Sequence, residues 1–320
     1  MNVLVVGGAG YVGGALVDML LRTHHSPRVY DALLYEESYR KQVDFAYGDV
    51  RDTETLLPHL KWADAVVWLA ALVGDGACAL NPDVSLEINQ ESVKWLSQNY
   101  DGRIVFMSTC SVYGAQDATL DESAPTDPLS VYAVTKLAAE QHLKGKNAII
   151  FRLGTLFGVG DVHSRIRLDL VVNTLTVRAH NTGRISVFGG DQFRPLLHVA
   201  DAAQAVVDSL EGVEVGVLNL HRQNVRIIDL AYQIRNHFPD VAIERTDVVF
   251  QDFRNYRVSS DKAHDVLGFK PDRSIDQGIE EVKELLDSHR ITDFENPRYT
   301  NQMFLSMFNT HTQFQSRSTC

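Results

Sequence analysis

The chain opens with a short apolar run that breaks into a glycine-rich turn and continues as a helical pattern. Val3-Leu4-Val5-Val6 leads into Gly7-Gly8-Ala9-Gly10-Tyr11-Val12-Gly13, and a helix is predicted from Tyr11 to Arg22. Glycines at the first, fourth and seventh positions of this turn permit a tight bend, close approach of a pyrophosphate to the backbone and close helix–strand packing. The helix N-terminus adds unpaired N–H groups and the positive end of a dipole. The residues expected at a dinucleotide are Gly7, Gly10, Tyr11, Val12 and Gly13.

Short apolar runs recur through the first half and alternate with helical patterns. The six predicted strands are 3–6, 28–30, 45–47, 65–69, 104–107 and 148–151, with the longest helices at 84–98 and 130–143. Strands buried on both faces read as continuous apolar runs, and their alternation with helices implies parallel pairing. The fold class is therefore α/β: a doubly wound parallel Rossmann sheet with a smaller C-terminal substrate-binding lobe.

The pattern changes after about residue 154, which sets the domain boundaries. We predict a cofactor-binding domain over 1–160, joined by sheet and helix segments around 185–215, and a mainly substrate-binding lobe over 161–290. Residues 291–320 lack periodicity, so we expect a tail.

Small and acidic residues follow the predicted strands where a cofactor would lie. Asp31 ends the second strand, and an acid there can bond both ribose hydroxyls and repel a 2′-phosphate. This favours NAD, although Arg28 and Arg40 nearby leave room for NADP. The further residues expected at the cofactor are Asp49 and Val50 after the third strand, and Leu69, Ala70 and Ala71 after the fourth.

Composition excludes several functions. The formal net charge of -11 disfavours binding to nucleic acid or an acidic membrane surface. Three cysteines without CxxC spacing suggest neither a disulfide framework nor a metal site, and no apolar run reaches the roughly 20 residues of a membrane helix. The N-terminus also lacks the basic region of a signal peptide. We expect a cytoplasmic protein without a metal.

Six motifs, in order, resemble the extended short-chain dehydrogenases, also called the NAD-dependent epimerase/dehydratase family. They are GGAGYVG, GDVRD, LAA, STCSVYG, YAVTK and FRPLLHVAD, and the resemblance covers roughly residues 1–290. It implies that Thr109, Tyr132 and Lys136 are catalytic, and that Tyr132 and Lys136 also contact the cofactor. The spacing of Tyr132 and Lys136 puts both on one helix face, where a lysine cation would lower the phenol pKa. Tyr132 could then exchange a proton with a sugar hydroxyl.

The residues after Thr109 narrow the choice among the reactions of this family. Nucleotide-sugar 4,6-dehydratases of this family carry Asp-Glu there, whereas this chain has Cys110-Ser111, so dehydration is disfavoured. The leading hypothesis is an NAD-dependent nucleotide-sugar 4-epimerase that oxidises and re-reduces C4. A net C4 dehydrogenase or reductase acting on a nucleotide-linked sugar or heptose remains open, and a non-catalytic NAD-sensing protein is disfavoured because Tyr132 and Lys136 are both present. Cys110 is expected to be a buried packing residue.

The resemblance also implies a substrate site. Arg194 and Arg254 match arginines that bind a sugar nucleotide's diphosphate, Asn173 matches an asparagine that touches the diphosphate or sugar, and Ser111 could contact the sugar. Arg165 and Arg167, just before the helix that carries Asn173, are further candidates. The apolar faces of helices 84–98 and 130–143 often pair across a dimer in this family, so a homodimer is expected.

Overall fold

A seven-stranded parallel sheet forms the centre of the molecule, in the order β11-β7-β5-β4-β1-β2-β3. The computed structural model describes residues 1–161, 163, 165–246 and 255–307. The chain builds outward from β1 in both directions, so the order reverses between β1 and β4, where ligands bind in such folds. The strands are β1 (Asn2–Val6), β2 (Ser26–Asp31), β3 (Asp44–Tyr47), β4 (Ala65–Trp68), β5 (Arg103–Thr109), β7 (Ala148–Leu153) and β11 (Gly216–Leu220).

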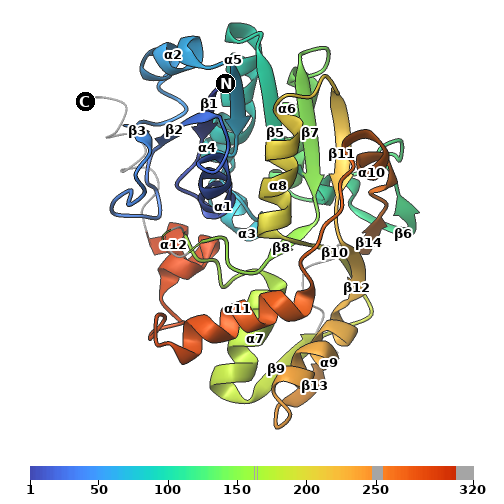
Figure 1. Ribbon diagram of the computed structural model, residues 1–320. Helices are drawn as coiled ribbons and strands as arrows, with labels where there is room; N and C mark the ends of the chain where they lie inside the picture. Colours follow the sequence, from blue (N-terminus) through green and yellow to red (C-terminus); the bar gives the residue numbers. More distant parts are fainter. Residues whose placement is uncertain (162, 164, 247–254, 308–320) are drawn as a thin grey trace.

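Helices cover both faces of this sheet, as predicted (Figure 1). On one face, α1 (Tyr11–Leu20) and α8 (Val199–Ser209) pack with the side chains of Val3 and Val5. On the other, Leu4 and Val6 pack with α2 (Thr53–Trp62), α5 (Ser92–Asn99) and α6 (Val131–His142). Alternate residues of one strand thus enter two cores, which explains why the strand is apolar throughout.

The helix predicted over 84–98 is interrupted. It consists of α4 (Pro82–Leu86), a π-helical turn η1 (Glu87–Glu91) and then α5. The turn carries the buried Asn89, whose side chain accepts a hydrogen bond from Leu72 N (2.8 Å) and donates one to Leu72 O (2.9 Å). These bonds anchor the loop after β4, and π-turns of this kind are frequent at functional sites.

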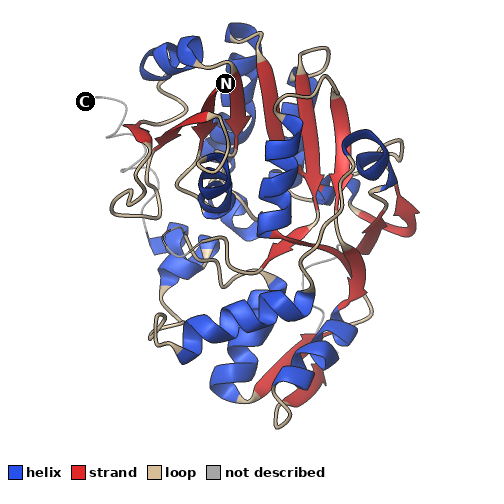
Figure 2. Ribbon diagram, in the orientation of Figure 1, coloured by secondary structure: helices blue, strands red, loops and turns tan. Residues whose placement is uncertain are grey.

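A smaller lobe, built mainly from the second half of the chain, lies below the sheet (Figure 2). Its strands form one three-stranded sheet and two two-stranded pairs. They are β8 (Thr155–Phe157), β10 (Phe193–His198) and β12 (Gln223–Arg226), then β9 (Arg184–Phe188) with β13 (Ala242–Thr246), and β6 (Ala115–Leu120) with β14 (Asn255–Val258). Its helices are α7 (Val171–Thr182), α9 (Ile227–His237) and α11 (Ile275–Asp287). The short α10 (Asp261–Leu267) instead packs beside β11 and α8.

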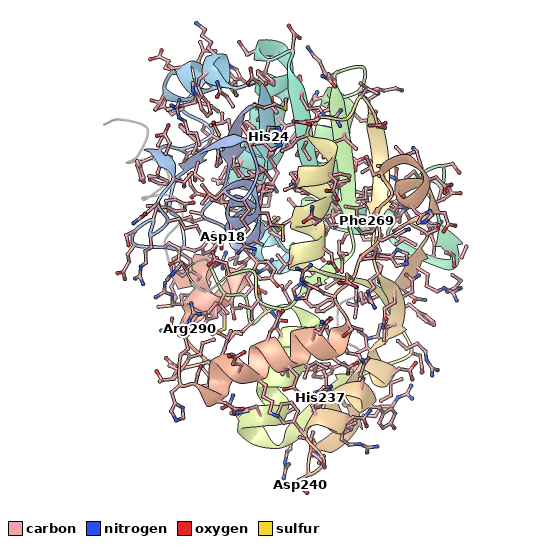
Figure 3. The ribbon with its side chains drawn as sticks, viewed as in Figure 1. Asp18, His24, His237, Asp240, Phe269 and Arg290 are labelled. Carbon is pink, nitrogen blue, oxygen red and sulfur yellow. The ribbon has the colours of Figure 1, made fainter. Side chains whose placement is uncertain are left out.

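Figure 3 shows how far the lobe extends from the sheet, with Asp18 on α1 in the main domain and His237 and Asp240 at the distant end. His237 joins α9 to α11, because its ring nitrogens lie 2.6 Å from Glu280 Oε1 and 2.8 Å from Asp276 Oδ1. A core of apolar residues from α7, α9 and α11 fills the space between these helices and β9. The lobe therefore has its own hydrophobic centre.

The prediction of a tail from residue 291 is wrong for the segment that ends at Met307. This segment contains a 3-10 turn η3 (Pro297–Tyr299) and α12 (Asn301–Met307), which packs on α3 (Asp75–Leu80). Asn301 and Leu305 are buried, one helical turn apart. A single turn of buried residues is too short to produce a periodic sequence signal, so the pattern of the sequence did not reveal it. Residues 308–320 lie outside the described part of the chain.

Within the residues that the structure describes, no helix is both long and apolar enough to cross a membrane.

Gly13 offers a test of how the first helix meets its turn. A Cβ atom there would lie 2.5 Å from the Gly8 carbonyl oxygen, so backbone atoms would have to move. We expect Gly13→Ala to lower the free energy of unfolding by about 1–3 kcal/mol, measured by urea denaturation. Gly10→Ala is the matched control, because its Cβ would approach only Gly7 O, at 3.3 Å. Equal losses in the two variants would contradict this account.

Candidate active site

A cavity of about 1160 Å³ lies between the carboxyl ends of the central strands and the smaller lobe. Both parts of the chain contribute to its wall, as expected where the strand order reverses. Most of the predicted site residues line it together. They are Gly7, Gly10, Tyr11, Val12, Gly13, Asp31, Asp49, Val50, Leu69, Ala70, Ala71, Thr109, Ser111, Tyr132, Lys136 and Arg194.

The glycine turn fits closely against the end of β4. Gly7 has a φ of +85°, and a Cβ atom on it would lie 2.5 Å from Ala70 N. Only glycine can combine this conformation with such a close approach. The turn leaves Gly10 as the N-cap of α1, and no side chain of the described residues caps this helix terminus. Its N–H groups are therefore suited to bind a phosphate.

Asp31 is held rigidly beside this turn. Its Oδ2 accepts a hydrogen bond from Ala9 N (2.9 Å) and its Oδ1 accepts one from Leu33 N (2.7 Å). Burial raises the pKa of Asp31, and these two backbone bonds act in the opposite direction. Each carboxylate oxygen keeps a second lone pair for a ribose hydroxyl. Asp49, by contrast, forms a bidentate contact with Arg51 (2.8 and 3.0 Å), so its carboxylate is already engaged.

The predicted catalytic residues come from two adjoining elements. Thr109 ends β5, and its Oγ1 accepts a hydrogen bond from Ser111 N (3.1 Å) at the start of the 3-10 turn η2 (Cys110–Tyr113). Tyr132 and Lys136 lie one turn apart on α6, and the Thr109 side chain hydrogen-bonds with Tyr132. Lys136 is buried and its Nζ donates to Met107 O (2.8 Å). The hydroxyls of Thr109 and Tyr132 and the amine of Lys136 thus face one cavity.

The pKa of Tyr132 differs from the sequence-based expectation. Burial raises the pKa of Tyr132 above its ordinary value, whereas the expected effect of Lys136 was to lower it. Burial also lowers the pKa of Lys136 to about 8. Both shifts have one main cause, since burial in the protein disfavours every charged form. The bond from Thr109 and the charge of Arg167 favour the tyrosinate, but burial outweighs them.

A buried ion pair supports the catalytic helix. Arg152 on β7 contacts the Glu140 carboxylate with Nη2 at 2.7 Å and Nε at 3.0 Å, and both residues are at most 5% exposed. Glu140 also accepts a hydrogen bond from the Ser108 hydroxyl, next to Thr109. Arg152 Nη1 donates to the Tyr113 hydroxyl (3.0 Å). This network joins α6 to the ends of β5 and β7.

The predicted substrate residues are not all at the cavity. Asn173 is buried and its amide bridges the backbone of Gly158 and Arg167, so it orders a loop and does not line the cavity. Arg167 forms a bidentate pair with Asp169 (2.9 and 3.0 Å) at the cavity wall. Arg254 lies outside the described residues. Cys110 is fully buried, and burial raises the pKa of its thiol.

The cavity residues that were not predicted from the sequence include Tyr256 and a group from the C-terminal segment. Tyr256 on β14 lies with its hydroxyl 3.4 Å from Ser111 Oγ, close to Thr109. The C-terminal segment also contributes to the cavity wall, through Thr300, Asn301, Gln302 and Leu305. Tyr256 follows the recognised motif residue Arg254 by two positions, which is the only local signal for it. The C-terminal residues have no such signal.

A glycine-turn Rossmann sheet with an acid after β2 and a Thr, Tyr and Lys at one cavity defines a dinucleotide-dependent dehydrogenase of the short-chain class. The model of the NAD dependent epimerase/dehydratase family matches residues 3–220. The chain belongs to this family, and it is an NAD-dependent enzyme of the extended short-chain type.

Relatives include both reaction types of the family. A UDP-glucose 4-epimerase of Rhizobium meliloti (strain 1021) is 29% identical, over 84% of this chain and 92% of that protein. A dTDP-glucose 4,6-dehydratase of Mycobacterium tuberculosis (strain H37Rv) is 27% identical, over 85% and 88%. Among solved structures, MoeE5 in complex with UDP-glucuronic acid and NAD is 25% identical with a TM-score of 0.77, covering 90% of this chain and all of that one.

The buried ion pair yields a stability prediction. Glu140→Ala leaves the Arg152 guanidinium buried without its carboxylate, so the free energy of unfolding should fall by about 3–5 kcal/mol in urea denaturation. The matched control is Glu91→Ala, which removes a surface pair with Lys94 (3.1 Å) and should cost under about 1 kcal/mol. Comparable losses in both variants would refute a special role for the buried pair.

Proposed function

We propose that the protein is an NAD-dependent nucleotide-sugar 4-epimerase. The observation that carries the proposal is the meeting of Thr109, Tyr132 and Lys136 at the cavity that also contains the glycine turn and Asp31. These groups suffice to move a proton at one sugar hydroxyl, and an epimerase cycle needs in addition only the hydride acceptor and donor that bound NAD would supply. The 4-epimerases among the relatives support the same activity.

Each residue has a distinct task in this cycle. Bound NAD would supply the hydride acceptor and donor at C4. Tyr132 takes the C4 hydroxyl proton as the sugar is oxidised and returns it on reduction, after the 4-keto sugar has presented its other face. Thr109 donates a hydrogen bond to the reacting oxygen, and protonated Lys136 stabilises the tyrosinate and bonds the nicotinamide ribose. Burial raises the Tyr132 pKa and so disfavours the tyrosinate. Its formation would therefore depend on the positive charges of Lys136 and of the bound oxidised cofactor.

Dehydration is disfavoured by the residues beside Thr109. Elimination of water needs an acid and a base near C5 and C6, and Cys110 and Ser111 occupy the positions where dehydratases carry Asp-Glu. Cys110 is fully buried with its thiol 3.1 Å from Arg152 O, so it does not reach the cavity. A net C4 dehydrogenase or reductase would use the same three residues and differ only in releasing its keto product.

Arg194 is the best candidate of the described residues for the substrate diphosphate. Arg194 lines the cavity from β10 in the smaller lobe and is 5% exposed, and its Nη1 donates to Phe193 O (2.9 Å). Ser111 and Tyr256 form the wall near Thr109 and would contact the sugar. Asn173 would act indirectly, by ordering the loop at Gly158. Arg254 keeps its assignment from the sequence motif.

The test of the reaction uses C4-deuterated UDP-glucose and dTDP-glucose with the purified protein and catalytic NAD. We expect NMR to show inversion at C4 with the deuterium retained. The Tyr132→Phe variant should lose about 10²–10⁴-fold in kcat. A keto sugar with stoichiometric NADH would contradict epimerisation and favour the dehydrogenase. Intact turnover in Tyr132→Phe would contradict the catalytic assignment itself.

We also propose that the enzyme is a cytoplasmic homodimer that pairs through α4 and α6. Leu86 and Val134 on these contacting helices are 42% and 49% exposed. Burying them against a second copy would remove apolar surface from water.

Light scattering should therefore give twice the chain mass, and Leu86→Glu with Val134→Glu should give a monomer. The matched control is Val213→Glu, at an 86% exposed position away from these helices, which should leave the dimer intact. A monomeric wild-type protein would rule out the proposal.

A further inference from the structure

Three buried polar atoms at the cavity have no well-aligned hydrogen-bond partner within the described part of the chain, although the side chains of Tyr35 and Arg165 interact with each other. They are the Tyr35 hydroxyl, Arg165 Nε and Asn301 Oδ1, and all three residues line the cavity. An unsatisfied buried polar atom is destabilising, and more so when the group is charged. Such atoms are rare in folded proteins, so three around one cavity suit the binding of a polar ligand there.

Arg165 is the charged member of this group. It is 5% exposed, and its guanidinium lies over the Tyr35 ring with the carbon 3.2 Å from the ring centre. This stacking leaves the Nε edge unsatisfied, and Nη2 makes only a long contact with Arg298 O (3.5 Å). Burial lowers the pKa of Arg165 to about 10, so the guanidinium still carries its charge at neutral pH.

The nearby carboxylates are engaged by other arginines. Asp169 forms its bidentate pair with Arg167, and Glu36 contacts Arg298 (3.0 Å). Arg165 therefore has no direct salt bridge among the described residues. Two donors, one of them cationic and planar, suit the oxygens of a phosphate group.

The loop that carries Tyr35 connects this group to the cofactor turn. It continues from Asp31, and its Lys41 donates to Gly14 O on α1 (2.6 Å). Lys41 also contacts Asp18 on α1 (2.8 Å) and Asp161 in the segment that leads to Arg165. Asn301 is fixed on the other side, where its Nδ2 donates to Val73 O (2.7 Å), just after the small residues that follow β4.

We propose that Arg165, Tyr35 and Asn301 form a subsite for the diphosphate of the NAD cofactor. Arg165 Nε and the Tyr35 hydroxyl donate to phosphate oxygens, and Asn301 Oδ1 accepts from an adjacent ribose hydroxyl. A sugar nucleotide carries the same diphosphate chemistry, but the attachment of this group to α1 and to the loop after Asp31 favours the cofactor. The proposal rests on the use of NAD in the function proposed above.

This subsite would connect three segments of the chain that are distant in sequence. The loop with Tyr35, the lobe segment with Arg165 and the C-terminal helix with Asn301 are distant in sequence, and the cofactor diphosphate would join all three. Binding energy from this subsite would then hold the smaller lobe and α12 against the main domain. A tightly held cofactor suits a reaction that oxidises and reduces the same molecule.

Calorimetric titration of protein freed of nucleotide tests the subsite with NAD, ADP, adenosine and UDP as probes. We expect Arg165→Met to weaken NAD and ADP binding by about 10–100-fold, because one charge-assisted contact is lost. Adenosine and UDP affinities should not change. Tyr35→Phe should weaken NAD and ADP by a smaller factor. Arg184→Met is the control, since Arg184 is exposed and pairs with Glu244 (3.3 Å) on the surface.

Thermal unfolding of the nucleotide-free proteins separates a binding role from a structural one. Loss of an uncompensated buried charge should leave the midpoint of Arg165→Met unchanged or higher. Unchanged ADP affinity in a folded Arg165→Met variant would overturn the proposal. A loss confined to UDP would also overturn it and assign the arginine to the sugar nucleotide. Because these titrations need no turnover, they stand apart from the test of epimerisation.

Discussion

The buried contact between Glu140 and Arg152 is the interaction on which the catalytic geometry depends. Glu140 follows Lys136 by four residues and Tyr132 by eight, so the three share one face of α6. Fixing Glu140 to Arg152 on β7 and to Ser108 on β5 therefore fixes the height and rotation of the whole helix. Thr109 is the next residue of β5, so hydroxyl, phenol and amine reach the same cavity.

The main sheet could be predicted because its strands are buried on both faces and give continuous apolar runs. The edge strand β11 was not predicted, because Gly216 and Asn219 interrupt its apolar pattern. Asn219 is nevertheless fully buried, because its side chain bonds with the Tyr113 hydroxyl (2.8 Å) and so joins the network of Arg152. A polar residue that is satisfied by tertiary contacts cannot be distinguished from a loop residue by sequence alone.

The cofactor turn and the Tyr132–Lys136 pair could be predicted because each is local: its residues lie within two helical turns and their spacing determines their geometry. The remaining wall of the cavity is assembled from distant segments. Tyr35, Arg165 and Asn301 meet only in the folded chain, and none belongs to a periodic pattern. Asn173 shows the limit of a motif, since its position suggested a ligand contact while its amide hydrogen-bonds with the backbone of Gly158.

The distribution of charge limits where an acidic protein could bind the two diphosphates of the proposed function. With a net charge of -11, the overall field repels anions, so binding depends on single arginines at the cavity. At the cavity wall, Arg167 is already paired with Asp169. Arg194 from β10 and Arg165 from the segment before α7 approach the cavity from separate elements of the smaller lobe. In the proposed function, each of these arginines would contact one of the two anionic ligands, and the reacting carbon would lie beside Tyr132.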